Sequence, residues 1–281
     1  MIVIKRASLL RTYLDEETTN SSRVGFVPTM GALHEGHLSL IEGAKKENAI
    51  VVCSIFVNPT QFNDPKDFEK YPITIEADIE LLEKAGVHVL FLPSVTEIYP
   101  NGTGQLPSYD LGYLETVLEG KYRPGHFQGV CQVMDRLMQL VKPDNLYMGQ
   151  KDYQQCMVVK KLIQLTGIKV NLHTCITLRE TDGLAMSSRN RRLNAEERQK
   201  AVIVSGVLDR IRKTVQPGPL EPIVSAAEQA LKENGFKVDY VAVADADSLE
   251  LPDEWDGSRP LVTLAAVYLN EVRLIDNMLI P

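Results

Sequence analysis

The sequence lacks any hydrophobic run of about 18 residues, the length that a membrane-spanning helix needs. Its opening, MIVIKRASLL, is too short and too soon charged for a signal peptide. Basic residues are outnumbered by acidic ones, 30 to 37, which gives a net charge of −7. This balance argues against a broad nucleic-acid surface but allows a local basic pocket. We therefore expect neither membrane nor nucleic-acid partners.

Cysteine is scarce. The four residues Cys53, Cys131, Cys156 and Cys175 show no CxxC and no Cys/His ligand spacing. Cys53 lies in the apolar run AIVVCSIFV and Cys131 in a predicted helix, so we interpret both as buried, reduced thiols. Reduced thiols are typical of a cytoplasmic protein, which is the location we expect.

Several catalytic motifs are also missing. The sequence has no GxGxxG, which weakens a dinucleotide-binding interpretation, and no GxxxxGK[ST], which excludes a P-loop NTPase. Neither GxSxG nor HExxH occurs, so serine hydrolase and zincin chemistry have no support.

The chain of 281 residues, 44% hydrophobic and 24% charged, is long enough for two domains. Apolar runs alternate with helical patterns through its first two-thirds. The runs RVGFVPT, AIVVCSIFV and VHVLFLP are apolar throughout, which is typical of strands buried on both faces of a parallel sheet. NLYMGQ and KVNLHTCIT are further predicted strands. This order predicts a doubly wound, Rossmann-like α/β domain over residues 1–178, with ligands at the carboxyl ends of its strands.

The pattern changes near residue 180. Asn194, followed three residues later by Glu197, is a plausible N-terminal pair for a helix, and EPIVSAAEQALKENG predicts a second helix. KVDYVAVADADSL and RPLVTLAAVYLNEVRLIDNMLI predict strands, the last a hairpin around Asn270. Helices followed by strands predict a smaller α+β domain over residues 179–281.

The first candidate for chemistry is HEGH, between a predicted strand and a predicted helix. His34 and His37 are three residues apart and share one face of a helical turn. If His37 lies in the first turn, backbone N–H groups there favour an anion, and Gly36 lets the anion approach closely. Two imidazoles could then hold phosphate oxygens or protonate a leaving group. The same residues could instead cap a surface helix or form a metal pair.

A second candidate, SIFVNPTQFNDP, ends a buried strand in Asn58 and Gln61. Polar amides at the carboxyl end of such a strand are where an α/β fold recognises its substrate, although Asn-Pro also begins ordinary turns. In YMGQKDYQQ, Lys151 could pair with a phosphate, and Asp152 could accept from a ribose hydroxyl or orient a metal. A solvated Lys-Asp pair that opens a helix is the alternative.

The last candidate is LAMSSRNRRL. Its two hydroxyls, on Ser187 and Ser188, and the guanidinium of Arg189 suit a triphosphate or a pyrophosphate leaving group. The alternative is a basic loop that caps the next helix.

HxGH followed far downstream by a Met-Ser-Ser-Arg loop resembles the HIGH and KMSKS signatures of the nucleotidyltransferase superfamily. The match becomes narrower when further segments are added. FVPTMGALHEGH, SIFVNPTQF, YRPGHFQGV, GQKDYQQ, LAMSSRN and RLIDN are similar, in order and position, to motifs of the pantothenate synthetase family. Together these segments extend over nearly the whole chain.

The resemblance implies a two-step ligation. The carboxylate of pantoate attacks the α-phosphorus of ATP and gives pantoyl adenylate and pyrophosphate. The amine of β-alanine then attacks the acyl carbon and releases pantothenate and AMP. The resemblance also implies a homodimer, Mg²⁺ that comes with the ATP phosphates rather than in a protein cage, and a C-terminal domain that closes over the ATP site.

The resemblance assigns roles to residues as well. His37 is the acid that assists the leaving group, and His34 is the supporting phosphate ligand. The other residues assigned to catalysis are Lys151, Ser187, Ser188 and Arg189. The ATP-binding residues are Pro28, Thr29, Met30, Gly31, Ala32, Leu33, His34, Glu35, Gly36, His37, Gly149, Gln150, Lys151, Asp152, Leu178, Met186, Ser187, Ser188 and Arg189. Gln61 and Gln155 hold pantoate, and Gln61 reaches the β-alanine site as well.

Two positions depart from the signatures. MGQKD stands where many relatives carry a phenylalanine and a glutamate around the glycine, and we expect little effect because the backbone makes the contacts. Ala185 stands in place of the first lysine of KMSKS, as it does in the pantothenate synthetase family, so the resemblance implies that phosphate binding falls more on Lys151 and Arg189. The role of residues 95–125 and of YRPGHF, as a mobile lid or an interface, stays open.

Three other functions compete with this hypothesis. A cytidylyltransferase or phosphopantetheine adenylyltransferase would bind a phosphate ester, which needs more basic residues than Gln61 and Gln155 provide. The acidic charge and the lack of an anticodon-binding extension disfavour a tRNA synthetase. A non-catalytic nucleotide sensor is disfavoured because the histidines, Lys151 and Arg189 are all kept.

Overall fold

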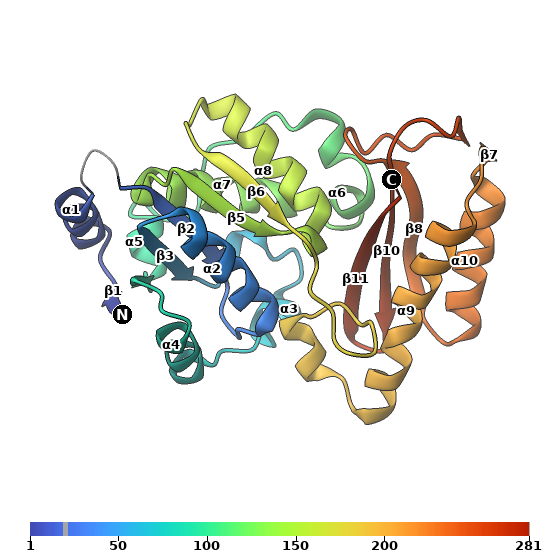
Figure 1. Ribbon diagram of the computed structural model, residues 1–281, viewed down its shortest axis with the longest axis horizontal. Coiled ribbons are helices and arrows are strands. Elements are labelled where there is room, and N and C mark those ends of the chain that lie inside the picture. Colours follow the sequence, from blue (N-terminus) through green and yellow to red (C-terminus); the bar gives the residue numbers. More distant parts are fainter. Residues whose placement is uncertain (19–21, 281) are drawn as a thin grey trace. The chain divides into compact units, whose positions relative to one another are not determined.

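The computed structural model describes residues 1–18 and 22–280 and divides into two compact units (Figure 1). Met1–Gln150 and Gln154–Ile176 belong to the N-terminal unit, whereas Lys151–Tyr153 and the chain from Thr177 onward belong to the C-terminal unit. The boundary after residue 178, proposed from the sequence, stays a prediction.

In the described part of the N-terminal unit, six strands form one parallel sheet. In spatial order they are β1 (Ile2–Ile4), β4 (Val89–Phe91), β3 (Ile50–Ile55), β2 (Val24–Thr29), β5 (Asn145–Gly149) and β6 (Asn171–Cys175). The predicted Rossmann-like sheet is confirmed. From β2 the chain first builds outward through β3 and β4, and it later returns to the other side of β2 with β5. The carboxyl ends of β2 and β5 are therefore the topological switch point, where such folds bind ligands.

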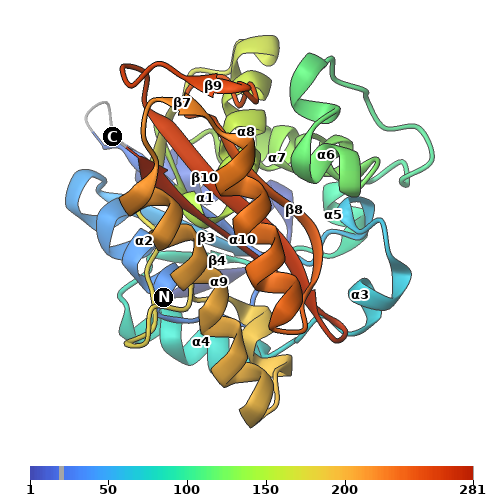
Figure 2. The same cartoon turned by 90° about the vertical axis from the view of Figure 1, so that its right-hand side faces the viewer.

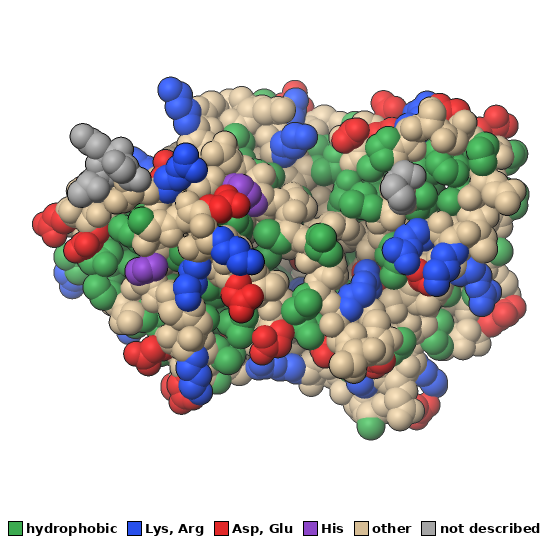
Figure 3. All heavy atoms as spheres, in the orientation of Figure 1, with side chains coloured by type: hydrophobic (Ala, Val, Ile, Leu, Met, Phe, Trp, Pro, Cys, Tyr) green, Lys and Arg blue, Asp and Glu red, His purple; other side chains and the backbone are tan. Residues whose placement is uncertain are grey.

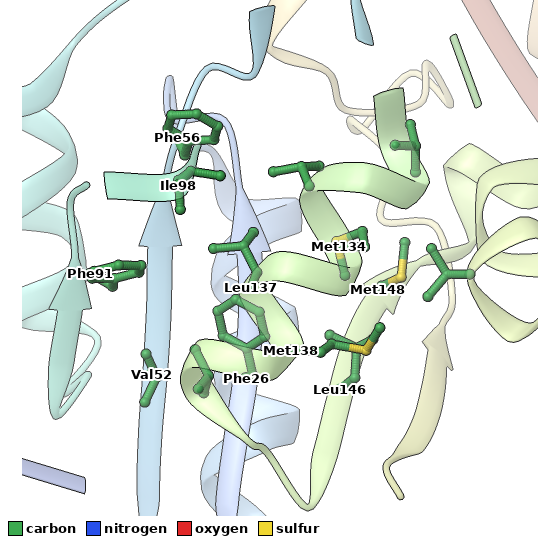
Figure 4. Close-up of a cluster of buried hydrophobic side chains, with 14 of the residues drawn as sticks. Phe26, Val52, Phe56, Phe91, Ile98, Met134, Leu137, Met138, Leu146 and Met148 are labelled. Carbon is green, nitrogen blue, oxygen red and sulfur yellow. The ribbon is translucent and has the colours of Figure 1, made fainter. Parts of the chain in front are cut away.

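Helices cover both faces of this sheet. The core on one face takes side chains from α1 (Ala7–Glu17), α7 (His126–Val141) and α8 (Tyr153–Thr166), and the core on the other takes them from α2 (Glu35–Glu47) and α4 (Ile75–Lys84). Figure 4 shows the first core, where Phe26 and Leu146 from neighbouring strands lie against Met138 of α7. Successive strand residues serve opposite cores, so Phe26 and the next residue, Val27, are both fully buried. This explains why the strands are apolar throughout.

Shorter elements complete the N-terminal unit: η1 (Pro59–Gln61), α3 (Pro65–Glu69), α5 (Val95–Ile98), η2 (Gly112–Glu115), α6 (Leu118–Tyr122) and the start of η3 (Gln150–Asp152). Several elements have no counterpart in the sequence predictions, namely β1, α1 and the short segments α3, α5 and α6. β1 has only three residues, and α1 begins after Arg6 without a side-chain cap, so the start of each element is weakly marked in the sequence.

The C-terminal unit packs two helices on an antiparallel sheet. The sheet has the order β11 (Val272–Ile280), β10 (Leu261–Leu269), β8 (Lys237–Asp245). Helices α9 (Ala195–Thr214) and α10 (Glu221–Glu233) lie over one face of it, in front of the strands in Figure 2. The unit also contains η4 (Ser188–Arg192) and the short pair β7 (Gly218–Pro219) and β9 (Glu254–Trp255). The predicted α+β arrangement is confirmed.

Two local predictions for this unit are also confirmed. Asn194 and Glu197 form a reciprocal capping box at the start of α9, with both N···O distances 2.9 Å. The β10–β11 hairpin turns at Asn270, whose φ of +51° places it in the left-handed region that asparagine tolerates.

The chemistry of the surface and of the thiols is ordinary. On the face of the N-terminal unit drawn in Figure 3, Lys and Arg side chains lie among Asp and Glu side chains. None of the described helices has both the length and the apolar character needed to cross a membrane. Burial raises the pKa of the Cys53 and Cys131 thiols to about 12, which agrees with their interpretation as reduced, unreactive thiols.

His88 should make the stability depend on pH. Its Nδ1 accepts a hydrogen bond from Val51 N at 3.0 Å, and burial, followed by the Lys45 ammonium, lowers the pKa of the ring below 6.5. At pH values between the lowered pKa of the folded chain and 6.5, His88 binds more protons in the unfolded chain than in the folded one. The contribution of His88 to the free energy of unfolding is therefore complete above pH 6.5 and is lost as the pH falls through the folded-state pKa. NMR titration should place the pKa of His88 below 6.5, and Lys45→Gln should raise it. A value at or above 6.5 in the native chain would contradict the effect of burial.

Candidate functional site

The chain turns sharply after β2. At the end of the strand, Thr29 Oγ1 donates to Ser54 O at 2.8 Å and accepts from Gly31 N at 3.2 Å. Gly31 (φ +81°) and Ala32 (φ +49°) both adopt the left-handed conformation, which reverses the chain before α2 begins. A Cβ on Gly31 would also lie 3.0 Å from a methyl of Ile55, so both conformation and space favour glycine.

A buried carboxylate holds this turn. Asp78 of α4 has no exposed surface, and its two oxygens accept from Ala32 N at 2.9 Å and from Leu33 N at 2.8 Å. Thr74 Oγ1 donates to the same carboxylate at 3.1 Å. Asp78 is not among the site residues predicted from the sequence. Its signal was present, because Asp78 and Leu82 are one helical turn apart and form the buried face of α4, where a charge is unexpected.

His34 and His37 cap the N-terminus of α2. His34 Nδ1 accepts from Gly36 N at 3.2 Å, and His37 Nδ1 accepts from His34 N at 3.3 Å. The ring centroids are 4.1 Å apart. Because each Nδ1 accepts a backbone N–H, the neutral rings carry their proton on Nε2. The capping alternative is therefore correct for the Nδ1 edge of each ring, and the proton of each neutral ring is on the Nε2 edge.

Asn58 organises the turn that follows β3. Its Nδ2 donates to Gly129 O at 3.0 Å and to Gln61 Oε1 at 3.2 Å, and its Oδ1 accepts from the hydroxyl of Tyr99 at 2.9 Å. Thr60 N also donates to Oδ1, at 3.4 Å. Burial raises the pKa of Tyr99, which keeps its hydroxyl protonated as a donor. Because a carbonyl only accepts and a backbone N–H only donates, these partners determine the orientation of the Asn58 amide.

The orientation of Gln61 follows from that of Asn58. Gln61 Oε1 faces the Asn58 donor, and its Nε2 lies 3.0 Å from Met30 Sδ, beside the turn after β2. Gln61 is 9% exposed. Its side chain therefore offers N–H donors at the carboxyl edge of the sheet, where they suit a carboxylate or hydroxyl oxygen.

The YRPGHFQGV segment supports the Gln61 turn. His126 Nδ1 lies 2.7 Å from Gln61 O, and Arg123 Nη1 lies 3.1 Å from His126 Nε2. Any Cβ on Gly129 would lie 2.2 Å from Thr60 O, so the first part of α7 can approach this turn only through a glycine. The sequence left this segment open as a lid or an interface; in the N-terminal unit it braces a predicted substrate residue.

The two adjacent glutamines after β5 have different surroundings. Gln154 is buried, and its Nε2 donates to Leu114 O at 2.8 Å while its Oε1 accepts from Glu119 N at 3.0 Å. It thus ties α8 to the η2–α6 segment. Gln155 is half-buried, which leaves it as the candidate for substrate binding.

The remaining predicted residues lie in the C-terminal unit. Leu178 and Met186 face each other in a hairpin, where Met186 N donates to Leu178 O at 3.1 Å. Ser187 then caps η4, since its Oγ accepts from Arg189 N at 3.3 Å. Ser188 is 7% exposed. Hydrogen bonds along the chain thus connect the predicted ATP-binding segments 178 and 186–189.

Lys151 belongs to this unit although it follows β5 by two residues. Asn277 Nδ2 donates to Lys151 O at 2.8 Å, and the Tyr153 hydroxyl donates to Ala246 O at 2.6 Å. Lys151 Nζ lies 4.0 Å from Asp152 Oδ1. The predicted site residues therefore form two groups. In the N-terminal unit, contacts join Pro28–His37 to Gln61. In the C-terminal unit, Lys151 is hydrogen-bonded to Asn277 of β11 and Arg179 of the 178–189 segment to Asp276 of β11.

The fold and the first group define a class of protein: an α/β protein with a Rossmann-like sheet and a histidine-capped helix at its switch point. The family model of pantoate–β-alanine ligases matches residues 2–279. The chain belongs to the pantoate–β-alanine ligase family, and the resemblance carried by its six motifs is confirmed.

Individual relatives are similar to this chain over nearly their whole length. Pantothenate synthetases of Cytophaga hutchinsonii and Porphyromonas gingivalis are 44% and 42% identical to this chain, with at least 99% of each sequence covered. The crystal structure of pantothenate synthetase from Thermus thermophilus matches with a TM-score of 0.90 at 40% identity, over 99% of both chains. The Francisella tularensis ligase, complexed with β,γ-ATP and β-alanine, matches at 0.84 and 38% identity, over 99% of this chain and 97% of that one.

Asp78→Asn should impair use of ATP without unfolding the chain. The amide would present an N–H₂ group to one of the two backbone donors in the turn, so the turn would shift. Misplacement of a substrate-binding segment by about 1 Å can cost on the order of 10²-fold in rate, and we expect a loss of that order in kcat/KM for ATP. Asp144→Asn is the control, because Asp144 accepts from Val24 N at 2.7 Å at the opposite end of β2. Equal losses in both variants would contradict a role in positioning the turn.

Proposed function

We propose that the chain ligates pantoate and β-alanine with ATP, through pantoyl adenylate, releasing AMP and pyrophosphate. Ligation of these two substrates is the activity for which its family is named. The observation that carries the proposal is the histidine-capped N-terminus of α2, which lies at the switch point of the sheet beside the donor side chain of Gln61.

ATP is the substrate of the first step. A helix N-terminus favours negative charge, and the Nε2–H groups of His34 and His37 add two directed donors. His37 assists the departure of pyrophosphate, because its Nε2–H donates to the leaving group as negative charge develops there. His34 holds the phosphates. The backbone of Pro28–Leu33 forms the rest of this ATP-binding surface, supported by the contacts of Asp78.

Pantoate lies beside Gln61 and Gln155. The donor orientation of Gln61 suits its carboxylate and hydroxyl oxygens, whereas a phosphate ester would require cationic partners. The carboxylate oxygen forms the new bond to the α-phosphorus of ATP, and the bond to pyrophosphate breaks. The acyl carbon becomes electrophilic because its oxygen is now part of a good leaving group. The β-alanine amine then forms the amide bond, loses a proton, and AMP departs.

The C-terminal unit supplies further phosphate ligands. Lys151 and Arg189 contribute positive charge, and Ser187 and Ser188 contribute hydroxyls. Asp152 contacts ATP next to Lys151, and Leu178 and Met186 contact it through the hairpin. Gly149 and Gln150, which belong to the N-terminal unit, are further ATP contacts. Their support is the matching motifs and the two connected segments described above.

Mg²⁺ enters with ATP in this proposal. No group of three or more His, Cys, Asp and Glu side chains that could hold a metal ion occurs among residues 1–18 and 22–280. The donors at hand are histidine Nε2–H groups, amides, hydroxyls and cations, which suit phosphate oxygens rather than a cation. The ion would therefore be bound through the phosphates and would neutralise part of their charge. We further propose that the protein is cytoplasmic and forms a homodimer. Gel filtration with light scattering would test the homodimer.

Pyrophosphate exchange into ATP tests the proposed activity. Exchange should require pantoate and should be absent with phosphopantetheine or without an acid, because only a carboxylate can form the acyl adenylate. Addition of β-alanine should then yield pantothenate and AMP in equal amounts. Failure of exchange with pantoate would reject the proposal, and exchange with phosphopantetheine would favour an adenylyltransferase.

His37→Ala should keep the fold and lose adenylate formation, with a cost of about 10²–10³ in rate for one oriented donor. Alanine also removes half of the capping box, so two further variants separate the roles. His37→Asn can retain an acceptor near the position of Nδ1 without the Nε2 donor, and it should be as impaired as alanine. His37→Gln can place an N–H near Nε2 and should recover part of the activity. Near-normal turnover of His37→Asn would contradict the assigned role.

A further inference from the structure

The RLIDN motif places two buried polar residues next to each other in β11. Asp276 is 5% exposed and Asn277 is 2% exposed. Asp276 lies on the same face of β11 as Leu274 and Ile280, two residues of the hydrophobic core of the C-terminal unit. A carboxylate in such a position requires a partner that compensates for its lost hydration.

That partner is Arg179. Its Nη1 and Nη2 donate to the two carboxylate oxygens of Asp276 at 2.7 and 2.9 Å. The same guanidinium donates to Gly183 O and to Asn277 O, both at 3.1 Å. One side chain thus joins β11 to two points of the 178–186 hairpin, in the planar geometry that suits arginine.

The hairpin carries two of the predicted ATP contacts. Arg179 directly follows Leu178 and pairs with Ala185, which directly precedes Met186. Glu180 N donates to Leu184 O at 2.8 Å, and Asn190 Nδ2 donates to Ala185 O at 3.0 Å. The Arg179–Asp276 pair therefore fixes the position of the hairpin, and with it the point at which Ser187–Arg189 begins.

Asn277 holds a different segment. Adjacent residues of a strand point to opposite faces, so Asn277 lies across the strand from Asp276. Its Nδ2 donates to Lys151 O at 2.8 Å. Two consecutive residues of β11 thus fix two segments that are far apart in sequence and that both carry proposed phosphate ligands.

We propose that Asp276 and Asn277 are positioning residues for the triphosphate of ATP. They do not contact the nucleotide; they act through Lys151 and through the hairpin that precedes Ser187–Arg189. The inference rests on the proposed function, because it assumes that both segments held by RLIDN, Lys151 and Ser187–Arg189, bind phosphate. Pantoate is assigned to Gln61 and Gln155 of the N-terminal unit, so its binding should depend little on β11.

The test compares Asp276→Asn with a substitution in a second ion pair, which joins Arg273 of β11 to Asp239 of β8. Arg273 Nε donates to Asp239 Oδ2 at 2.9 Å, and both side chains are 13% exposed. Asp239→Asn therefore removes an ion-paired carboxylate, somewhat more exposed than that of Asp276 (13% against 4%), that is hydrogen-bonded to neither ATP segment. For the wild type and each variant we would measure the KM values for ATP and pantoate, kcat, the melting temperature, and ATP affinity by calorimetric titration.

Asp276→Asn should lower kcat/KM for ATP on the order of 10²-fold and weaken ATP binding, with the KM for pantoate within about twofold of wild type. Asp239→Asn should lower the melting temperature and leave both KM values unchanged. Asn277→Ala should also raise the KM for ATP. An unchanged ATP constant in Asp276→Asn, or equal losses in both aspartate variants, would overturn the proposal.

Two further results keep the test decisive. If Asp276→Asn does not fold, Asn277→Ala and Arg179→Lys carry the same comparison, and wild-type use of ATP by both would overturn the inference. If the wild type shows no exchange with pantoate, the proposed function fails. The ATP affinities of wild type and Asp276→Asn then still decide whether β11 positions a nucleotide site.

Discussion

The hydrogen bonds from Ala32 N and Leu33 N to the buried carboxylate of Asp78 are the constraint on which the candidate site depends. A non-glycine residue in the left-handed region costs about 1–3 kcal/mol, and Ala32 keeps that conformation inside a folded core. Two charge-assisted bonds from the backbone offset this strain, and they also satisfy a carboxylate that has lost its water. The start of α2, and with it both histidines, follows from the position of this turn.

The same device recurs at the other loops of the site. Asn58 receives and donates five hydrogen bonds that orient Gln61 and hold its turn against α7. Asp276 and Asn277 hold the hairpin and Lys151 in the C-terminal unit. In each case a buried polar side chain fixes the backbone of a functional loop, either from a distant element (Asp78, Asp276 and Asn277) or from within the turn itself (Asn58). Such an arrangement suits a reaction in which catalysis consists mostly of positioning and of stabilising phosphate charge.

Pattern-based prediction succeeded where the physical cause lies within a few residues. The apolar runs of β2 and β3, the Asn194–Glu197 capping box and the turn at Asn270 all follow from local rules. The same holds for the helix that begins at the HEGH motif. The short strand β1 and the uncapped helix α1 were not predicted, and both pack against distant parts of the chain.

The sequence alone determined the fold class, the family and the types of side chain available for chemistry, because periodicity, caps and motifs are written in neighbouring residues. Tertiary structure alone decided what each polar residue does. It separated Gln154, bonded to Leu114 and Glu119, from the half-buried Gln155, and it assigned Lys151 to the C-terminal unit. These distinctions depend on hydrogen bonds between residues 35 to 126 positions apart, and no local pattern encodes a partner at that distance.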